Sequence, residues 1–158
     1  MYCDIFFDDN APRTVVVVPS LSLDQEVLGK ISGVHHYEER MLCLLLLLRL
    51  PRTELVFLTS KPVPETIIDY YLHMLPGIPA QHARRRLKLF SCHDGSAMAL
   101  SEKLLARPRL LERIRQAISN PARTHMTCFN VTALERRLAL AFDIPLYGCD
   151  PDLIELGS

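Results

Sequence analysis

The sequence lacks several features that would identify its chemistry directly. Only 6 of its 158 residues are glycine, and they form neither G-x-x-x-x-G-K-[ST] nor G-x-G-x-x-G. Both patterns place backbone N–H groups around a phosphate, so a nucleotide site of the usual glycine-loop type is not expected. The 18 basic and 18 acidic side chains leave a net charge of zero. A neutral chain argues against binding to nucleic acid or to an anionic membrane.

Cysteine pairs, a leader segment and long apolar runs are also absent. The odd set of cysteines consists of Cys3, Cys43, Cys92, Cys128 and Cys149. Because none of them forms a C-x-x-C pair, we expect reduced, buried thiols in place of a disulfide framework or a zinc site. The amino terminus lacks the basic region of a secretory signal, and the apolar run 41–48 is far shorter than the roughly 20 residues of a membrane span. These absences predict a soluble, cytoplasmic protein.

What the chain does contain is enough apolar residues for a full hydrophobic core. With 49% hydrophobic residues in 158, we expect a single domain. The stretch 37–49 has apolar side chains at helical spacing and predicts the central helix of that domain. The second half of this helix is apolar on every face, which predicts burial on several sides. The pair Leu50-Pro51 ends it, because a residue before proline avoids the helical conformation.

Short apolar runs bounded by turn residues predict five strands, at 14–18, 55–58, 87–91, 125–129 and 144–147. Further helices are predicted at 22–31, 64–75, from Ser101, from Pro108, at 132–142 and at 151–156, with capping boxes at Ser22-x-x-Gln25 and Thr132-x-x-Glu135. Alternating strands and helices indicate an α/β fold, in which helices cover both faces of a mostly parallel sheet. We expect the strand order 3-2-1-4-5.

Residues 1–13 do not fit that alternation. We interpret them as an arm that docks on the domain or on a second copy. Within the arm, Ile5–Phe7 has the composition of a short edge strand, and Asp8-Asp9-Asn10 has that of a turn.

The parallel sheet also predicts where a ligand binds. Ligands of such sheets lie beyond the carboxyl ends of the strands, and right-handed crossovers bring the start of the helix 37–49 to the same edge. The candidate substrate-binding residues are Ser20, Tyr37, Glu38, Arg40, Thr59, Ser60, Asp94, Asn130 and Asp150. We expect Ser60, Asp94 and Asn130 within about 12 Å of one another. This mixture of groups suits a zwitterion such as an amino acid, and equally a phosphate with bound metal.

Several of these residues also have a purely structural interpretation. Glu38 could complement a helix dipole as well as contact a ligand. Asp150 before Pro151 has the pattern of a helix cap. Cys92-His93-Asp94 has the residue types of a cysteine nucleophile, yet adjacent residues of an extended segment point to opposite sides. We therefore favour a structural thiol beside a polar loop, and we predict neither catalytic nor metal-binding residues in this chain.

Seven short motifs together resemble the N-terminal segment of one enzyme family. They are Pro19-Ser-Leu-Ser-Leu23, His36-Tyr-Glu-Glu-Arg40, Val56-x-x-Thr-Ser60, Asp69-Tyr-Tyr71, Ala83-Arg-x-Arg-Leu87, Arg107-Pro-Arg-Leu-Leu111 and Leu146-Tyr-Gly-Cys-Asp-Pro-Asp152. The set is similar to the ATP-grasp carboxylate–amine ligases related to the pheganomycin-type peptide ligase. The resemblance covers nearly everything after residue 13.

The resemblance implies that residues 14–158 form a pre-ATP-grasp domain, a Rossmann-like three-layer sandwich that precedes the catalytic ATP-grasp module. In the full-length protein, ATP and magnesium would activate a carboxylate as an acyl phosphate for attack by an amine. The ATP-grasp module is absent from this chain, so we expect no cofactor here and no activity from this fragment by itself. The implied partners are that module and a small carboxylate or amino-acid substrate.

Two other functions remain open from the sequence. The chain could be a stand-alone small-molecule-binding or assembly module without catalysis, and a homodimer formed through the arm would suit the assembly role. A small hydrolase using Cys92 is a third, weaker hypothesis.

Overall fold

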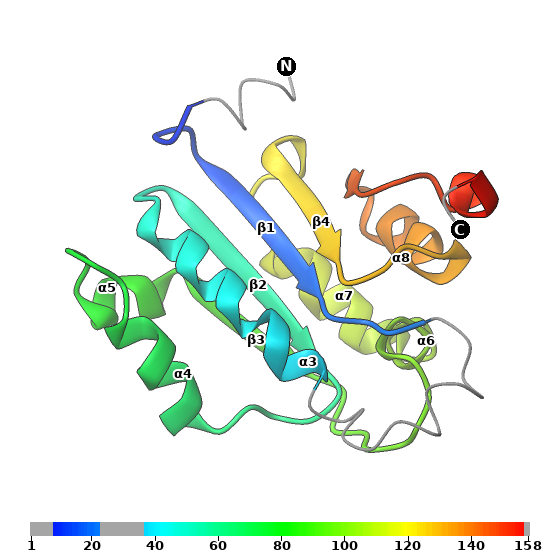
Figure 1. Ribbon diagram of the computed structural model, residues 1–158, viewed down its shortest axis with the longest axis horizontal. Helices are drawn as coiled ribbons and strands as arrows, with labels where there is room; N and C mark the ends of the chain where they lie inside the picture. The colour runs from blue at the N-terminus through cyan, green and yellow to red at the C-terminus, as the bar shows by residue number, and fades with distance from the viewer. Residues whose placement is uncertain (1–7, 23–36, 157–158) are drawn as a thin grey trace.

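The structure is a computed structural model, shown in Figure 1, and it describes residues 8–22 and 37–156. The strands are β1 (Arg13–Val18), β2 (Thr53–Thr59), β3 (Leu87–Ser91), β4 (Thr124–Cys128) and β5 (Leu146–Tyr147). The helices are α3 (Tyr37–Arg40), α4 (Glu65–His73), α5 (Ala80–Arg85), α6 (Leu100–Leu105), α7 (Pro108–Ala117) and α8 (Ala133–Phe142), with 3₁₀ helices η2 (Met41–Arg49), η3 (Pro121–Arg123) and η4 (Pro151–Leu156). Within these residues no helix is long and apolar enough to cross a membrane.

The strands form one parallel sheet in the order β3-β2-β1-β4-β5. Val16 of the central strand β1 lies opposite Val56 on one side and Met126 on the other. The chain winds outward from β1 through β2 to β3, and then returns to place β4 on the other side of β1. The direction of winding therefore reverses between β1 and β4. The predicted fold class and strand order are confirmed.

Helices cover both faces of the sheet and produce three layers (Figure 1). Side chains alternate along each strand, so β1 sends Val15 and Val17 to one face and Val16 and Val18 to the other. On the first face the buried partners come from η2, α4, α5 and the segment that follows α4, and they are Leu42, Leu45, Leu48, Ile68, Leu72, Leu75 and Ala83. On the second they come from α6, α7, α8 and adjoining residues, and they are Leu100, Leu104, Ile114, Ile118, Leu138, Ala139, Phe142 and Ile144.

The central helix differs from its prediction in geometry and in burial. It is α-helical over Tyr37–Arg40 and continues as a 3₁₀ helix to Arg49. Leu42, Leu45 and Leu48 are buried at the three-residue interval of such a helix, whereas Leu46 is 40% exposed. A second line, Met41, Leu44 and Leu47, is half-buried against the same core. The expected burial is therefore wrong only for the third line, which contains Cys43 and Leu46 and faces solvent because η2 lies in an outer layer.

The end of η2 is held by Arg86, which directly precedes β3. Its guanidinium donates to the carbonyl oxygens of Leu48 at 2.6 Å, Leu50 at 2.7 Å and Thr53 at 2.9 Å. The last carbonyls of a helix have no partner within the helix, so this side chain supplies their missing donors. Burial lowers the pKa of Arg86.

Smaller differences between the predictions and the structure concern the extent of two elements and the exposure of two cysteines. The sequence predicted no helix where α5 lies, and β5 begins at Leu146, two residues later than expected. Cys43 and Cys149 are exposed, so the expectation of buried thiols is wrong for them; Cys43 lies on the outer line of η2 and Cys149 follows β5.

Near the amino terminus, the turn at Asp8 is confirmed, since its carboxylate accepts from the Asn10 N–H at 2.9 Å. The expectations for Cys3, for the strand Ile5–Phe7 and for the helix 22–31 lie outside the described residues, apart from Ser22.

Candidate functional site

The carboxyl ends of β2 and β3 are joined through Ser60, the residue that follows β2. Its carbonyl oxygen accepts from the Asp94 N–H at 2.9 Å and from the Ser91 hydroxyl at 3.2 Å. Thr59 is used in the same way, since its carbonyl accepts from the Cys92 N–H at 2.9 Å. The structure thus places three sequence-predicted residues, Thr59, Ser60 and Asp94, at the same edge of the sheet.

A buried lysine lies beneath this junction. Lys103 of α6 is 2% exposed, and its ammonium donates to the Ser60 hydroxyl at 2.9 Å and to the carbonyl oxygens of Asp94 at 3.1 Å and Ser96 at 2.8 Å. An ammonium has three protons, and these three oxygens accept all of them. Lys103 therefore fixes the 94–96 loop to the end of β2.

The same loop carries an ion pair at the surface. Arg107 donates to Asp94 Oδ2 at 2.6 Å and to the Lys103 carbonyl at 2.8 Å. Hydrogen bonds from Ser96, joined by the one from Arg107, hold the pKa of Asp94 well below its usual range. Asp94 is thus an anion with its own partners, and its role here is to stabilise the loop.

The first turn of α3 meets this junction from the opposite side. Glu38 Oε2 accepts from the Ser60 N–H at 2.7 Å. The guanidinium of Arg40 lies 4.5 Å from the ring centroid of Tyr37, and this ring in turn packs edge-on against Phe129 at 5.4 Å. Tyr37, Glu38 and Arg40 therefore lie at the predicted edge, with Arg40 exposed to solvent.

A buried carboxylate organises the ends of β1 and β4. Glu135 of α8 is fully buried, and its Oε1 accepts from the Ser101 hydroxyl at 2.6 Å. Its Oε2 accepts from the Ser22 hydroxyl at 2.7 Å, from the Thr132 hydroxyl at 2.7 Å and from the Thr132 N–H at 2.9 Å. Burial by itself would raise the pKa of Glu135, but hydrogen bonds from Ser101, Thr132 and Ser22 outweigh it and lower the pKa. The predicted capping box of α8 is confirmed.

Residues 20–22 fill the position between β1 and β4, where the winding reverses. The Ser20 hydroxyl accepts from the Ser101 N–H at 3.2 Å. Asn130 accepts from the Ser22 N–H at 3.2 Å and donates to the Ser22 hydroxyl at 2.8 Å. Two predicted site residues, Ser20 and Asn130, therefore hold the chain's own segment at this place.

Asp150 lies apart from the other predicted site residues and has partners of its own. It pairs with Arg136 of α8, and its carboxylate also accepts from the Asp152 N–H at 3.1 Å at the start of η4. The predicted helix cap is therefore present. The carboxylate is engaged at the β5 side of the domain.

The arrangement around Cys92 does not resemble an activated nucleophile. Burial raises the pKa of its thiol, although the charges of Arg107 and Lys103 act in the other direction, and reactive cysteines require a lowered pKa. His93 is exposed and has a positive φ of 52°. No cluster of three or more His, Cys, Asp or Glu side chains suited to a metal occurs in the described part of the chain.

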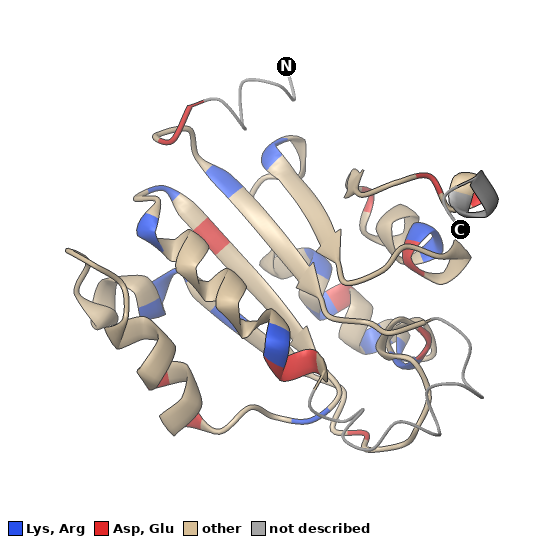
Figure 2. Ribbon diagram, viewed as in Figure 1, with Lys and Arg blue, Asp and Glu red and all other residues tan. Residues whose placement is uncertain are grey.

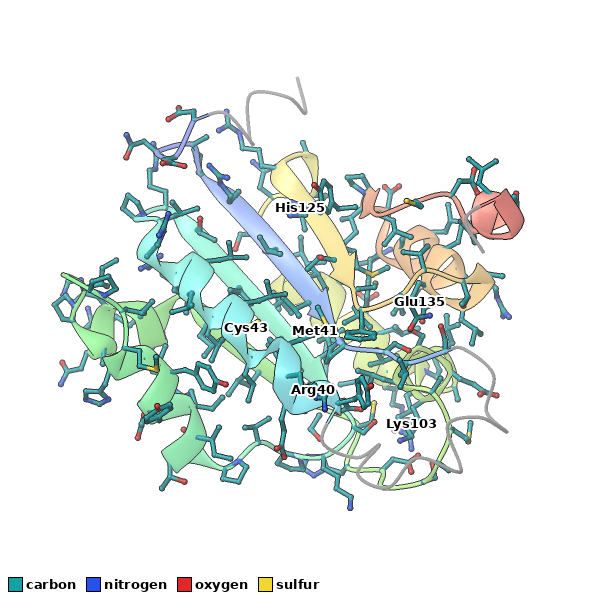
Figure 3. The ribbon with its side chains drawn as sticks, viewed as in Figure 1. Arg40, Met41, Cys43, Lys103, His125 and Glu135 are labelled. Atoms are coloured by element: carbon teal, nitrogen blue, oxygen red, sulfur yellow. The ribbon has the colours of Figure 1, made fainter. Side chains whose placement is uncertain are left out.

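The sequence analysis did not identify Lys103 and Glu135 as the buried charges that organise this edge. Figure 3 shows Lys103 and Glu135 on the side of the domain to which the strands β1, β2 and β4 point, with Arg40 near the end of β2. Lys103 sits in a helix without a distinctive pattern, and nothing in the sequence marked it. Glu135 was recognised as a cap, but Ser101 and Ser22 are too distant along the chain to be identified as its partners.

Comparison with known proteins gives one match. The chain is 30% identical over 117 residues to the L-propargylglycine–L-glutamate ligase of Streptantibioticus cattleyicolor, covering 70% of this chain and 24% of the ligase. The chain thus spans about a quarter of that protein's length. No protein-family model and no solved structure matches it. The likeness supports a distant relationship to a ligase.

Proposed function

We propose that the chain is the substrate-side, pre-ATP-grasp domain of an ATP-dependent carboxylate–amine ligase, with residues 14–158 as that domain. The similarity to a ligase named for two amino acids carries this proposal. A parallel sheet with polar groups at its carboxyl edge agrees with it, because that edge is where such sheets hold small ligands.

The proposed reaction joins a carboxylate to an amine. A carboxylate oxygen attacks the terminal phosphorus of ATP, ADP leaves, and the amine nitrogen then attacks the acyl carbon and displaces phosphate. ATP and magnesium belong to the ATP-grasp module in this scheme. The contribution of the present chain is to orient the substrate, and the side chains placed to do so are those of Tyr37 and Arg40 on α3.

Arg40 is the residue best suited to the substrate among those predicted. It is exposed at the carboxyl edge, and stacking on Tyr37 keeps its planar guanidinium in place. Such a fork binds a carboxylate through two parallel hydrogen bonds. Ser20, Thr59, Asp94, Asn130 and Asp150 support the edge in this scheme, because their polar groups already have partners within the chain.

The test uses the natural protein that contains this chain. With ATP, magnesium and pairs of amino acids, we expect ADP release that requires both a carboxylate and an amine, and hydroxylamine should trap the activated acid as a hydroxamate. Arg40→Ala should raise KM about tenfold or more for the substrate whose carboxylate it binds. Arg49→Ala is the matched control, since Arg49 is exposed at the other end of the same helix. ADP release that is independent of any carboxylate would contradict the proposal.

A second test uses the chain itself. Because the nucleotide is assigned to the other module, calorimetric titration with magnesium–ATP should detect no binding tighter than about millimolar, or roughly −4 kcal/mol. Micromolar affinity would place a nucleotide site within this sheet and overturn the assignment.

A further inference from the structure

The bond between Glu38 and Ser60 places a carboxylate of the protein itself at the carboxyl edge of the sheet. The Ser60 N–H is the first backbone donor beyond the end of β2, and Glu38 Oε2 accepts from it at 2.7 Å. A hydrogen bond from an amide to an ionised carboxylate is the contact by which a protein backbone commonly binds an acidic ligand. The structure thus shows a carboxylate in place, supplied from within the chain.

The surroundings of Ser60 favour an anion. The buried ammonium of Lys103 lies 2.9 Å from the Ser60 hydroxyl oxygen, and its other contacts are carbonyl oxygens of the 94–96 loop. These neutral acceptors satisfy the hydrogen-bonding capacity of the ammonium. The nearby Asp94 carboxylate interacts with the charge of Lys103, but its hydrogen-bonded ion pair is with Arg107. In a buried setting such a charge acts over several ångströms. A carboxylate at the Ser60 N–H is therefore stabilised by a buried cation that is shielded from solvent.

The neighbouring surface suits the rest of an amino acid. Phe129 is 48% exposed and packs on Tyr37, the residue before Glu38, so an apolar ring faces solvent close to the bond. Figure 2 shows basic and acidic ribbon segments together at α3, in contrast to the uncharged ribbon of residues 41–48 that follows it. A cation, an amide donor and an exposed aromatic ring are the groups that would bind an amino acid by its carboxylate and its side chain.

We propose that the Ser60 N–H is a backbone donor for the substrate carboxylate, in addition to Arg40, and that Glu38 occupies it as an internal competitor until substrate binds. The identity of the ligand as an amino acid rests on the proposed function. On binding, the Ser60 N–H exchanges one carboxylate oxygen for another while Lys103 stays in place. The competitor lowers the apparent affinity in proportion to the time for which it occupies the donor. Occupancy near 90% corresponds to about a tenfold loss.

The experiment is a titration followed by nuclear magnetic resonance of the ¹⁵N-labelled chain, with acetate and then L-glutamate as probes. The observable is the amide signal of Ser60 as a function of probe concentration, in the native chain, in Glu38→Gln and in Glu38→Ala. Glutamine keeps a neutral acceptor and alanine keeps none, so affinity should rise in that order, by about tenfold from native to Glu38→Ala. Glu39→Ala, which removes the adjacent carboxylate, should leave the affinity unchanged.

Each outcome decides the proposal. A graded gain at Ser60 that Glu39→Ala does not reproduce supports it. A Ser60 signal that does not respond to either probe overturns it, and so does an equal gain in Glu39→Ala, which would indicate a general charge effect. If Glu38→Ala fails to fold, Glu38→Gln against the native chain answers the same question. The readout needs neither ATP nor ligation, so failure here leaves the ligase proposal to its own test.

Discussion

Two neighbouring parts of the same sheet edge are built around buried charges of opposite sign. At β2 and β3 the organiser is Lys103, which donates to a hydroxyl and two carbonyl oxygens. At β1 and β4 it is Glu135, which accepts from three hydroxyls and one backbone N–H. Removing the lysine would leave acceptors without a donor, whereas removing the glutamate would leave one buried donor, on Ser101, and the half-buried donors of Ser22 and Thr132 without their acceptor. Unpaired donors are the costlier of the two.

The largest expected effect follows from removing the carboxylate. Glu135→Ala should lower the free energy of unfolding by about 3–5 kcal/mol, because the buried Ser101 hydroxyl and the half-buried donors of Ser22 and Thr132 would lose their acceptor together. Urea denaturation measures this loss. Glu112→Ala, at an exposed position of α7, is the matched control and should change stability by less than about 0.5 kcal/mol. A loss below about 1 kcal/mol for Glu135→Ala would mean that water reaches these donors.

Removal of the lysine should lower the free energy of unfolding by a smaller amount. Lys103→Met keeps most of the aliphatic stem and should destabilise by about 1–2 kcal/mol, since carbonyl oxygens tolerate the loss of a partner better than donors do. Exposure of Ser96 also lets water replace one contact. Lys61→Met, at an exposed lysine of the same edge, should be nearly neutral in the same denaturation measurement. A loss for Lys103→Met equal to that for Glu135→Ala would refute the distinction between donors and acceptors.

Acid should remove the contribution of Glu135 to the stability of the fold within a defined range of pH. Glu135 has a lowered pKa in the folded state, so the unfolded chain takes up protons first as the pH falls. Its contribution is complete above the unfolded value of about 4.3 and is lost as the pH falls through the folded pKa. Melts between pH 6 and 3 should therefore show a steeper decline for the native chain than for Glu135→Gln.

Other groups that titrate in this range need separate controls. Burial, together with the charge of Arg13, lowers the pKa of His125 to about 4. Its contribution to stability is thus lost between about pH 6.5 and 4, and a His125→Gln background removes it. Asp94→Asn does the same for the carboxylate on the other side. Equal slopes for the native chain and Glu135→Gln in those backgrounds would contradict the prediction.

The smallest expected effects are changes in the reactivity of two thiols, Cys92 near Lys103 and Cys128 near Glu135. Burial raises the pKa of Cys92, opposed by the charges of Arg107 and Lys103, while burial and the charge of Glu135 both raise that of Cys128. Lys103→Met should therefore slow alkylation of Cys92 at pH 8 about two- to fivefold, and Glu135→Gln should speed that of Cys128 by a similar factor. Mass spectrometry of the labelled peptides measures both rates. The exposed Cys43 is the internal control, and its rate should not change in either variant.

The sequence predicted the layers of this fold better than its contacts. Valine-rich β1 and the capping box at Thr132 have strong local patterns, and both were placed correctly. The prediction for the run 41–48 is too broad, because an all-apolar segment carries no periodicity and its sequence cannot show which line of residues faces solvent. The convergence of Ser60 and Asp94 followed from topology alone. The charges beneath them did not, because Lys103 meets its partners only through the packing of α6 against the sheet.

The uncharged run of η2 leaves the alignment of that helix underdetermined. In a 3₁₀ helix every third residue shares a line, so sliding by one position in one direction would exchange Leu42, Leu45 and Leu48 for the line Met41, Leu44 and Leu47, which is also apolar. Hydrophobic burial would change little, and it cannot choose between these two lines. The choice falls to polar contacts at the two ends, where Glu38 binds Ser60 and Arg86 binds the carbonyls of Leu48 and Leu50. A few hydrogen bonds thus set the register of the element that contributes more buried leucines to one face of the core than any other element does.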